Sequence, residues 1–274
     1  MDVRRADLHT HTTCSDGKLA PSELIRKVHS YGIQAVAVTD HDSIDGYAEA
    51  LSTGLRLGVE VITGVELSVT FDHQELHLLG YFFDPEHPDL TEHLRNFRRR
   101  RMERALGIID LLNKMGLPLL LEDVLVFARD GVVGRPHIAQ ALMSTGLVAS
   151  YDDAFGLYLK DFGPAFVPKP IFPAADAIAL LRHAGGISSL AHPGTRVSMI
   201  TIEALIQKGL DAIETVHPSH GYVLSRQYKQ FAKDRGLIET GGSDYHGFRA
   251  EEDQNLTRFS IPYRRLERIR KAAA

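Results

Sequence analysis

The sequence predicts an α/β fold in which short apolar strands alternate with amphipathic helices around a parallel sheet or barrel. Three observations support this fold class. Strand-like and helix-like segments alternate along most of the chain, polar clusters with His, Asp or Glu follow the strand-like segments, and residues 99–166 form successive helices with no convincing strand. Because the carboxyl ends of the strands form the active-site face of an α/β barrel, the position of the polar clusters indicates a functional site.

Composition limits the classes of protein that this chain can represent. Its 274 residues are 44% hydrophobic and 24% charged, as in a globular protein, and its net charge of −4 provides no positive field for long nucleic acid. A single cysteine, Cys14, rules out an internal disulfide, and the chain has no signal-peptide core and no apolar run of membrane-spanning length. We therefore expect a cytoplasmic protein with a small-molecule partner and no membrane contact, of unknown oligomeric state.

The elements of the expected barrel follow one another in regular order. The first strand leads into DLHTHTTCSDG (residues 7–17), and a helix over residues 21–33 has a proline start and a glycine stop. QAVAVTDHD then forms a buried strand, and ELHLLGY is an alternating strand. Further helix–strand pairs are IDGYAEALSTGLRLG with VEVITGVELS, PAADAIALLRHAGG with ISSLAHPG, TIEALIQKGL with DAIETVHPSH, and SRQYKQFAKDRG with LIETGGSDYH.

The central segment interrupts this order. Residues 99–166 are expected to form a helical insert that covers the barrel mouth, so the barrel domain comprises residues 1–98 and 167–274. Ser150 and Asp153 have the spacing of a capping box at a helix start. The run Arg98–Arg101 could form an RNA-binding patch, but consecutive helical residues point in different directions, so we interpret the run as a solvated helix surface.

The first motif contains two histidines that could hold a metal ion. His9 and His11 are two residues apart, so in a strand they point to the same side and can bind one ion together. Asp7 has the same parity and could orient one of the imidazoles. By themselves these residues are almost equally compatible with an ordinary polar loop.

Further imidazoles and carboxylates follow the later strands, and together they favour a metal site. They are Asp40, His41 and Asp42, then Glu66, His77, His192, His217, His220, Asp244 and His246. A mixed His and carboxylate set without cysteine suits Mn²⁺, Fe²⁺ or Zn²⁺ in an open catalytic site rather than a closed structural zinc site. Because one ion cannot use so many ligands, we expect two or three divalent ions.

The ordered motifs H-x-H, T-D-H, an isolated Glu, H, A-H-P and G-S-D-x-H resemble the polymerase and histidinol phosphatase (PHP) family of phosphoesterases, from Asp7 to His246. The resemblance implies a distorted (β/α)7 barrel with a trinuclear metal centre. It implies that one ion is held by His9, His11, Glu66 and Asp244, a second by Glu66, His77 and His192, and a third by Asp16, His41 and His246. Many family members have His where this chain has Asp16, which favours Mn²⁺ or Fe²⁺ at the third position.

Within the family, the short chain and the stretches GRPHIA (residues 134–139) and VPKP (residues 167–170) most resemble the nucleoside 3′,5′-bisphosphate phosphatases, which overlap with the RNase AM (TrpH-like) exoribonucleases. The similarity implies removal of the 3′-phosphate from compounds such as pAp by metal-activated hydroxide, which yields a nucleoside 5′-monophosphate and phosphate. Two alternatives within phosphoester chemistry are a 5′→3′ exoribonuclease acting on short 5′-phosphorylated RNA and a histidinol-phosphate phosphatase. An amidohydrolase and a non-catalytic module are less compatible with Glu66 and with the full set of ligands.

Several residues outside the ligand set are candidates for catalysis or substrate binding. His217 either protonates the leaving oxygen or only hydrogen-bonds the phosphate, and Asp40 is a second catalytic candidate. Arg135 and His137 lie at the start of a helix, where free N–H groups and the helix dipole attract phosphate. Lys169 and Arg196 are weaker candidates for phosphate binding. Cys14 is expected to be a spectator, and His220 has no assigned role.

Overall fold

The computed structural model describes residues 4–128 and 131–273, and it contains one eight-stranded sheet in the order β7-β6-β5-β4-β3-β2-β1-β8. The strands are β1 (Arg5–Thr10), β2 (Ala35–Val38), β3 (Glu60–Phe71), β4 (Gln74–Tyr81), β5 (Ile187–Leu190), β6 (Ala212–Val216), β7 (Ile238–Gly241) and β8 (Ile261–Pro262). The sheet curves until the segment after β7 reaches β1, where Asp244 N–H donates to His9 O at 2.9 Å and His11 N–H donates to Tyr245 O at 2.9 Å. The result is the nearly closed α/β barrel that the sequence predicts.

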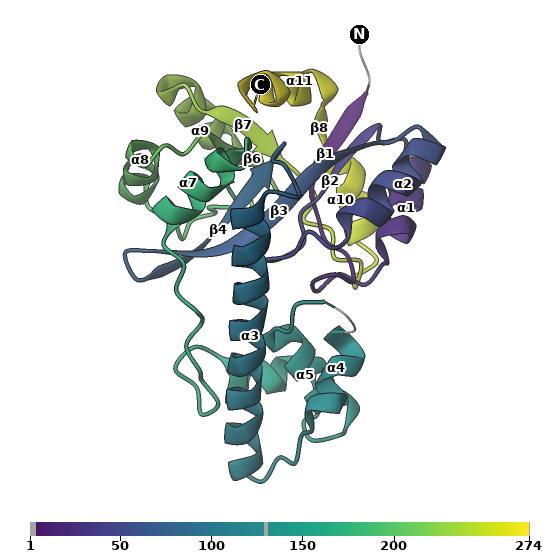
Figure 1. Cartoon of the computed structure of the whole chain (residues 1–274), viewed down its shortest axis with the longest axis vertical. Helices are drawn as coiled ribbons and strands as arrows, with labels where there is room; N and C mark the ends of the chain where they lie inside the picture. The colour runs from purple at the N-terminus through teal and green to yellow at the C-terminus, as the bar shows by residue number, and fades with distance from the viewer. Residues whose placement is uncertain (1–3, 129–130, 274) are drawn as a thin grey trace.

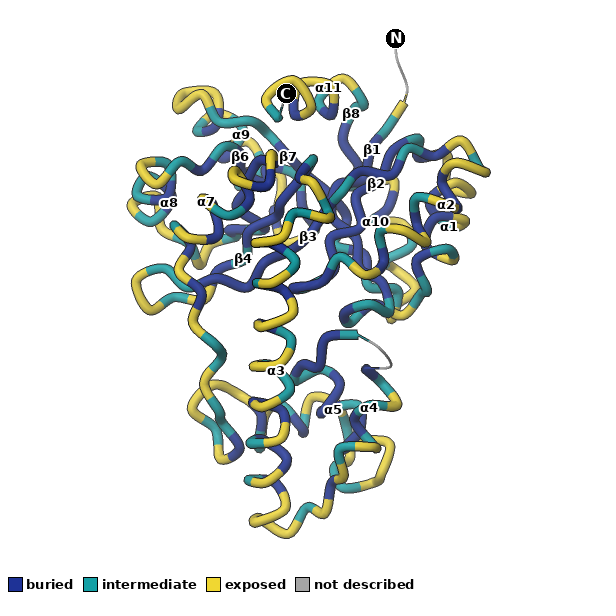
Figure 2. The backbone as a smooth tube through the Cα atoms, in the orientation of Figure 1, coloured by how far each residue is buried: buried dark blue, intermediate teal, exposed yellow. Residues whose placement is uncertain are grey.

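Helices cover the outside of this barrel (Figure 1). They are α1 (Pro21–Ser30), α2 (Tyr47–Leu57), α7 (Ala174–His183), α8 (Met199–Gln207), α9 (Tyr222–Arg235), α10 (Glu252–Arg258) and α11 (Tyr263–Ala273). In α1, the buried residues Leu24, Ile25 and Val28 recur at helical spacing and pack with the strand residues Val36 and Val38. Figure 2 shows the strands as the most continuously buried part of the molecule.

Strand β4 runs antiparallel to both of its neighbours, β3 and β5, which departs from an all-parallel sheet. The cause is a tight hairpin whose two turn residues, Asp72 and His73, have φ values of 47° and 62°. Positive φ at both central positions is characteristic of a type I′ turn, which matches the twist of an antiparallel pair. The hairpin places His77 opposite Ser68 on β3, so His77 reaches the site from within a strand.

The central segment forms a helical lobe below the barrel in Figure 1. Its elements are α3 (Pro88–Lys114), α4 (Leu121–Ala128), α5 (Arg135–Ser144), α6 (Tyr151–Asp153) and the π-helix η1 (Ala154–Leu159). The capping interaction expected at Ser150 is confirmed, because its hydroxyl accepts a hydrogen bond from Asp153 N–H at 3.0 Å.

Helix α3 begins within the part of the sequence assigned to the barrel and continues into the lobe. Leu90, Leu94 and Phe97 pack in the same apolar cluster as residues of β3 and β4, whereas Ala105 and Ile108 pack in the separate cluster of the lobe. This change of packing partners along α3 supports our proposal that the helical insert comprises residues 99–166. Within the described residues, none of the helices has the length and apolarity that crossing a bilayer requires.

Closure of the barrel depends on a close backbone approach at Gly242. A Cβ atom at this position would lie 2.4 Å from both the Cβ and the backbone N of His9. We predict that Gly242→Ala lowers the free energy of unfolding by about 2–3 kcal/mol through this overlap, as measured by urea denaturation. The matched control is Gly156→Ala, whose added Cβ would meet nothing within 4 Å. Equal stability of the two variants would contradict this account of closure.

Candidate active site

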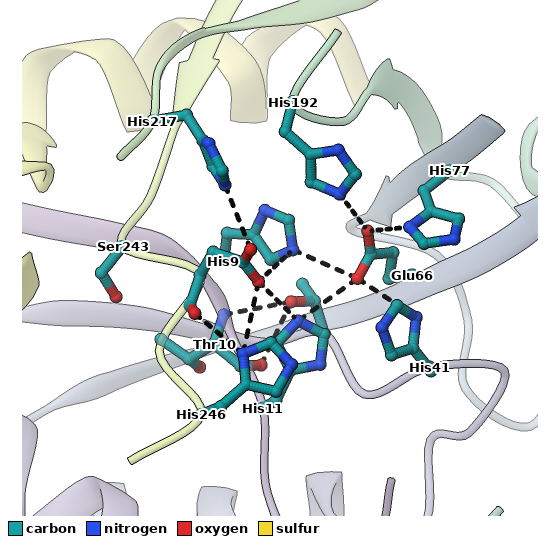
Figure 3. Close-up of polar contacts among 12 residues, drawn as sticks. His9, Thr10, His11, His41, Glu66, His77, His192, His217, Ser243 and His246 are labelled. Atoms are coloured by element: carbon teal, nitrogen blue, oxygen red, sulfur yellow. Dashed lines mark hydrogen bonds and ion pairs between the residues drawn. The ribbon is translucent and has the colours of Figure 1, made fainter. Parts of the chain in front are cut away.

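Glu66 lies at the centre of a cluster of imidazoles at one end of the barrel (Figure 3). One carboxylate oxygen, Oε1, is 2.9 Å from His77 Nδ1 and 2.9 Å from His192 Nε2. These two histidines come from β4 and from the segment after β5, which the antiparallel pairing of β4 and β5 brings together. The three residues are the set that the sequence predicts for one ion.

The second oxygen of Glu66 points to a different group of ligands. Glu66 Oε2 is 3.2 Å from the Nε2 atoms of both His9 and His11. Asp244 Oδ1 faces the same two nitrogens, at 3.4 Å from His9 and 3.1 Å from His11. His9, His11, Glu66 and Asp244 therefore surround one point, as the sequence predicts for another ion.

The third predicted group also meets in space. His246 Nε2 is 3.3 Å from Asp16 Oδ1, and His41 Nε2 is 3.9 Å from Asp16 Oδ2. These residues and His11 have ligand atoms that all lie within 4.8 Å of one another. The structure thus brings all nine predicted metal ligands into one cluster, in three overlapping groups that share Glu66 and His11.

Several buried polar atoms of this cluster have no hydrogen-bond partner, which is consistent with binding of divalent cations. Both ring nitrogens of His11, Nδ1 of His41 and Oδ1 of Asp16 are buried without a hydrogen-bond partner. An unsatisfied buried polar group costs about 1–3 kcal/mol, so several such atoms facing one space indicate a missing partner. Imidazole and carboxylate donors without thiolate are the ligands of Mn²⁺, Fe²⁺ or Zn²⁺ in catalytic sites.

The electrostatics of the cluster also favour cation binding. Burial alone would raise the pKa of the Glu66 carboxyl, but the imidazoles of His41, His9 and His77 hold this pKa well below its usual value. Burial lowers the pKa of His41 to about 3, so its imidazole is neutral and retains a lone pair for a ligand bond. Ionised carboxylates and a neutral imidazole are the forms that coordinate metal ions.

Glu214 orients two of the ligands, and sequence reasoning missed it. It is fully buried on β6, where its carboxylate lies 3.1 Å from His9 Nδ1 and accepts a hydrogen bond from His192 N–H at 2.7 Å. A carboxylate in this position fixes the ring orientation of His9 and leaves Nε2 to face the other ligands. The available signal was a charged residue inside the otherwise apolar strand AIETV.

Asp7 and Asp40 support the backbone around the site. The sequence suggested that Asp7 orients an imidazole, and this is wrong. Instead, Asp7 Oδ1 accepts a hydrogen bond from the backbone N–H of Ser243 at 2.9 Å. Asp40 is buried, and its carboxylate accepts from Thr12 N–H, Thr12 Oγ1–H and Ser15 Oγ–H at 2.6–2.7 Å. Through these bonds, the carboxylate of Asp40 holds the loop that joins His11 to Asp16. The geometry favours a positioning role for Asp40 over direct contact with substrate.

Backbone conformations with positive φ occur at two of the ligands. His192 has a φ of 25° and Asp244 a φ of 51°, values that side chains other than glycine rarely adopt. His192 lies two residues after the end of β5 and Asp244 three residues after the end of β7, where the chain turns these side chains into the cluster. Strain of this kind persists where surrounding contacts hold it, and it is concentrated at functional sites.

A basic cavity of about 170 Å³ adjoins the cluster on the side of His41 and His77. Four cationic side chains from the insert and the return segment line it, together with an aromatic ring and parts of the cluster: Arg101, Arg104, Arg135, Lys169, Phe155, Pro136, Ser68, Asp16, His41 and His77. Arg135 donates to Leu159 O at 2.8 Å, and Lys169 pairs with Glu75.

The expectation that Arg98–Arg101 is a solvated surface is wrong for Arg101. Its side chain is 11% exposed and pairs with the buried carboxylate of Asp42, while Arg99 on another face of α3 is 67% exposed. Helix α3 passes along the mouth of the barrel and turns one side of the run inward. Arg104, also unassigned from the sequence, is buried and donates to Val167 O at 2.8 Å.

The other predicted substrate contacts lie in different surroundings. His137 is buried, and its Nδ1 accepts from Gly134 N–H at 3.1 Å, so this nitrogen caps the start of α5. Arg196 is exposed in the segment between β5 and α8 and does not line the basic cavity. Cys14 is half-buried, and burial raises its pKa to about 11, which agrees with a spectator role.

His217 and His220 follow β6 and have distinct environments. His217 Nε2 is 3.2 Å from Asp244 Oδ2, and its Nδ1 accepts from Ser219 N–H at 3.0 Å. The hydrogen bond from Ser219 leaves the proton of neutral His217 on Nε2, which faces the cluster. His220 is buried, and its Nε2 accepts from Gly194 N–H at 3.1 Å, which holds the segment after His192.

Comparison with known proteins identifies the family. The PHP domain matches residues 7–164, which is more than half of the chain and includes six of the nine predicted ligands: His9, His11, Asp16, His41, Glu66 and His77. The chain belongs to the PHP domain family. Its metal-dependent phosphoester chemistry agrees with the cluster of imidazoles and carboxylates around Glu66.

Individual PHP relatives are similar over most of their length. A 5′-3′ exoribonuclease of Haemophilus influenzae is 34% identical, over 89% of this chain and 90% of the relative. A 3′,5′-nucleoside bisphosphate phosphatase of Chromobacterium violaceum is 31% identical, over 88% of this chain and 86% of the relative. A solved structure from Bifidobacterium adolescentis, described as a metal-dependent phosphoesterase, superposes with a TM-score of 0.83 at 29% identity and covers 89% of this chain and 88% of its own.

Because Glu66 contacts two groups of ligands, its removal should affect more than one ion. We predict that Glu66→Ala lowers the Mn²⁺ content by about two ions per chain and that His192→Ala lowers it by about one. Equilibrium dialysis followed by elemental analysis measures the metal content. The matched control is Glu60→Ala, which alters the same strand at a carboxylate that pairs with Tyr263 and Arg270. A Glu66→Ala protein with unchanged metal content would contradict the bridging arrangement.

Proposed function

We propose that this protein is a metal-dependent phosphatase that removes the 3′-phosphate from nucleoside 3′,5′-bisphosphates. The observation that carries the proposal is the basic cavity beside the ligand cluster. A substrate with one phosphate at the metal centre and a second phosphate a short distance away requires a second anion site, and this cavity has the charge and position for it. The activity named for the relative from Chromobacterium violaceum supports the same substrate class.

The second anion site combines several sources of positive charge. Arg101, Arg135 and Lys169 each pair with one carboxylate, of Asp42, Asp161 and Glu75 respectively. Even so, burial and the neighbouring Arg135 and Arg101 guanidinium groups lower the pKa of Arg104 to about 10, so a further anion among these cations would be favourable. Arg135 also begins α5, where backbone N–H groups and the helix dipole attract phosphate. A guanidinium can bind phosphate through two parallel hydrogen bonds. We assign the 5′-phosphate to this cavity, with Arg101, Arg104, Arg135 and Lys169 around it.

The chemistry at the 3′-phosphate combines the bound cations with groups of the chain. Two or three divalent ions, with Mn²⁺ as our first choice because Asp16 supplies a carboxylate, would neutralise the phosphate charge and lower the pKa of bound water. The chain's own part is to fix the ligands through Glu66 and Glu214 and to hold the 5′-phosphate. We assign His217 the role of a hydrogen-bond donor to the 3′-phosphate. An acid role would require a proton on Nδ1, where Ser219 N–H already donates.

A second candidate function is the removal of nucleotides from the 5′ end of short 5′-phosphorylated RNA. The same cavity would bind the terminal 5′-phosphate, and the exoribonuclease of Haemophilus influenzae supports this candidate. Histidinol phosphate carries one phosphate and would leave the basic cavity without an anion, so we favour it less.

The test of the proposed function is a comparison of substrates. Metal-stripped protein reconstituted with Mn²⁺ is assayed for phosphate release from adenosine 3′,5′-bisphosphate, adenosine 3′-monophosphate and histidinol phosphate. We expect the highest kcat/KM for the bisphosphate, because only this compound fills both anion sites. A higher kcat/KM for histidinol phosphate would overturn the proposal.

Arg135 provides a specific test of the second anion site. We predict that Arg135→Ala lowers kcat/KM for adenosine 3′,5′-bisphosphate about 10- to 100-fold, because a hydrogen bond to a charged group contributes about 1.5–3 kcal/mol. The kcat/KM for adenosine 3′-monophosphate should change less than about threefold. Arg99→Ala, an exposed position of the arginine run on α3, is the matched control. Equal losses on both substrates would remove Arg135 from the phosphate site.

The role of His217 is tested by the leaving group. We predict that His217→Asn lowers turnover of 4-nitrophenyl phosphate and of adenosine 3′,5′-bisphosphate by a similar factor, about tenfold or more, because a donor to the phosphate affects both compounds. The acidic nitrophenol needs no proton to leave, whereas the 3′-alkoxide does. A loss confined to the bisphosphate would instead make His217 the acid.

A further inference from the structure

A second, wider cavity of about 960 Å³ reaches the ligand cluster at Asp244 and His246, and no substrate group has yet been assigned to it. Its inner wall is formed by Asp16, Asp244 and His246. Its outer walls come from α5 and α6 of the lobe and from the segment that leads into α10 of the barrel. A volume of this size is at the upper end of the range for small-molecule sites and exceeds what a phosphate requires.

The two cavities contact different ligands of the cluster. The basic cavity contacts His41 and His77, whereas the wide cavity contacts Asp244 and His246, and the two share only Asp16 and Pro136. In the proposed binding mode, the 5′-phosphate of a nucleotide occupies the basic cavity and its 3′-phosphate lies at the cluster. Beyond the 3′-phosphate, the substrate would extend away from the basic cavity. Any group esterified to the 3′-phosphate would therefore enter the wide cavity.

The walls of the wide cavity fit a nucleobase better than they fit a chain of phosphates. Tyr151 and Phe248 are 37% and 51% exposed, and such large apolar rings beside a polar site indicate a binding surface. Gln140 and Asn255 line the same cavity, and within residues 4–128 and 131–273 their side-chain amides make no hydrogen bond, so they can meet the polar edge of a base.

The charges in the wide cavity do not form a basic track. Arg249 contributes one cation and Asp152 one anion, and the Glu252 carboxylate accepts hydrogen bonds from the backbone N–H groups of His246 and Gly247. Recognition there would depend on stacking and on the base edge rather than on contacts to the phosphate backbone. This is the pattern expected for one base, and it limits the useful length of the substrate.

We propose that the wide cavity binds the nucleotide that follows the scissile phosphate, with its base stacked on Phe248 and Tyr151. The inference rests on the second candidate of the proposed function, cleavage of short 5′-phosphorylated RNA, and adds to it a site for the base of the second nucleotide. In the reaction, the oxygen of water bonds to phosphorus, the bond between phosphorus and O3′ of the first nucleotide breaks, and one water proton ends on O3′. The products are a nucleoside 5′-monophosphate and an RNA shortened by one nucleotide that retains a 5′-phosphate.

The experiment compares a 5′-phosphorylated diadenylate, the same compound with an abasic second residue, and adenosine 3′,5′-bisphosphate, all with the Mn²⁺-loaded full chain. We expect the wild-type protein to prefer the diadenylate over the abasic compound by about tenfold, since base stacking on an aromatic ring contributes about 1–3 kcal/mol. Phe248→Ala should abolish this preference and leave kcat/KM for the bisphosphate within about twofold of wild type. Phe248→Trp, which retains a stacking surface, should restore the preference.

Tyr31→Ala is the matched control, because Tyr31 has the same 37% exposure as Tyr151 but lies at the end of α1, outside both cavities. Tyr151→Ala should reduce the preference for the base, and Tyr31→Ala should not. If Phe248→Ala lowered kcat/KM equally for the bisphosphate and the diadenylate, the base of the first nucleotide would occupy the cavity. That result would overturn this inference but not the proposed function. A wild-type protein that cleaves none of the three compounds would overturn both the inference and the proposed function.

Discussion

The carboxylate of Glu66 is the constraint on which the site depends. It is buried within 3.3 Å of five imidazoles, three facing one oxygen and two facing the other. Such a group cannot remain ionised in the barrel interior without positive partners, and the histidines supply them when protonated or when they share cations with it. The curved sheet brings imidazoles from several strand ends to this one carboxylate, and Glu214 contacts His9 from its other ring nitrogen.

The reaction site is built from two separately packed parts of the chain. The barrel supplies the predicted metal ligands, while the lobe supplies Arg101, Arg104 and Arg135 from α3 and α5. The ion pair between Arg101 and the buried Asp42 joins the two parts close to the cluster. If the basic cavity binds phosphate as proposed, substrate choice depends on the position of the lobe as well as on the metal ligands of the barrel.

The sequence predicted the parts of the site that follow strand ends, because residue spacing there determines side-chain direction. His9, His11 and Asp244 were found in this way, and the alternation of polar and apolar residues identified His77 within its strand. Asp16 was added only by the resemblance to the PHP family. The direction of β4 was missed because its turn residues, Asp72 and His73, lack the glycine that usually marks a type I′ turn. Arg101, Arg104 and Glu214 were missed because their roles depend on which element packs opposite them, and local sequence does not contain that information.

Helix α3 has a mechanical consequence for access to the site. Its first turns are packed into the barrel core and its later turns into the lobe core, without a break in the helix between them. A hinge between the two bodies would have to disrupt backbone hydrogen bonds in the middle of this helix, which opposes large opening motions. We therefore expect the barrel and the lobe to keep their relative positions, so that the size of a molecule, rather than closure of the protein around it, would decide whether it enters.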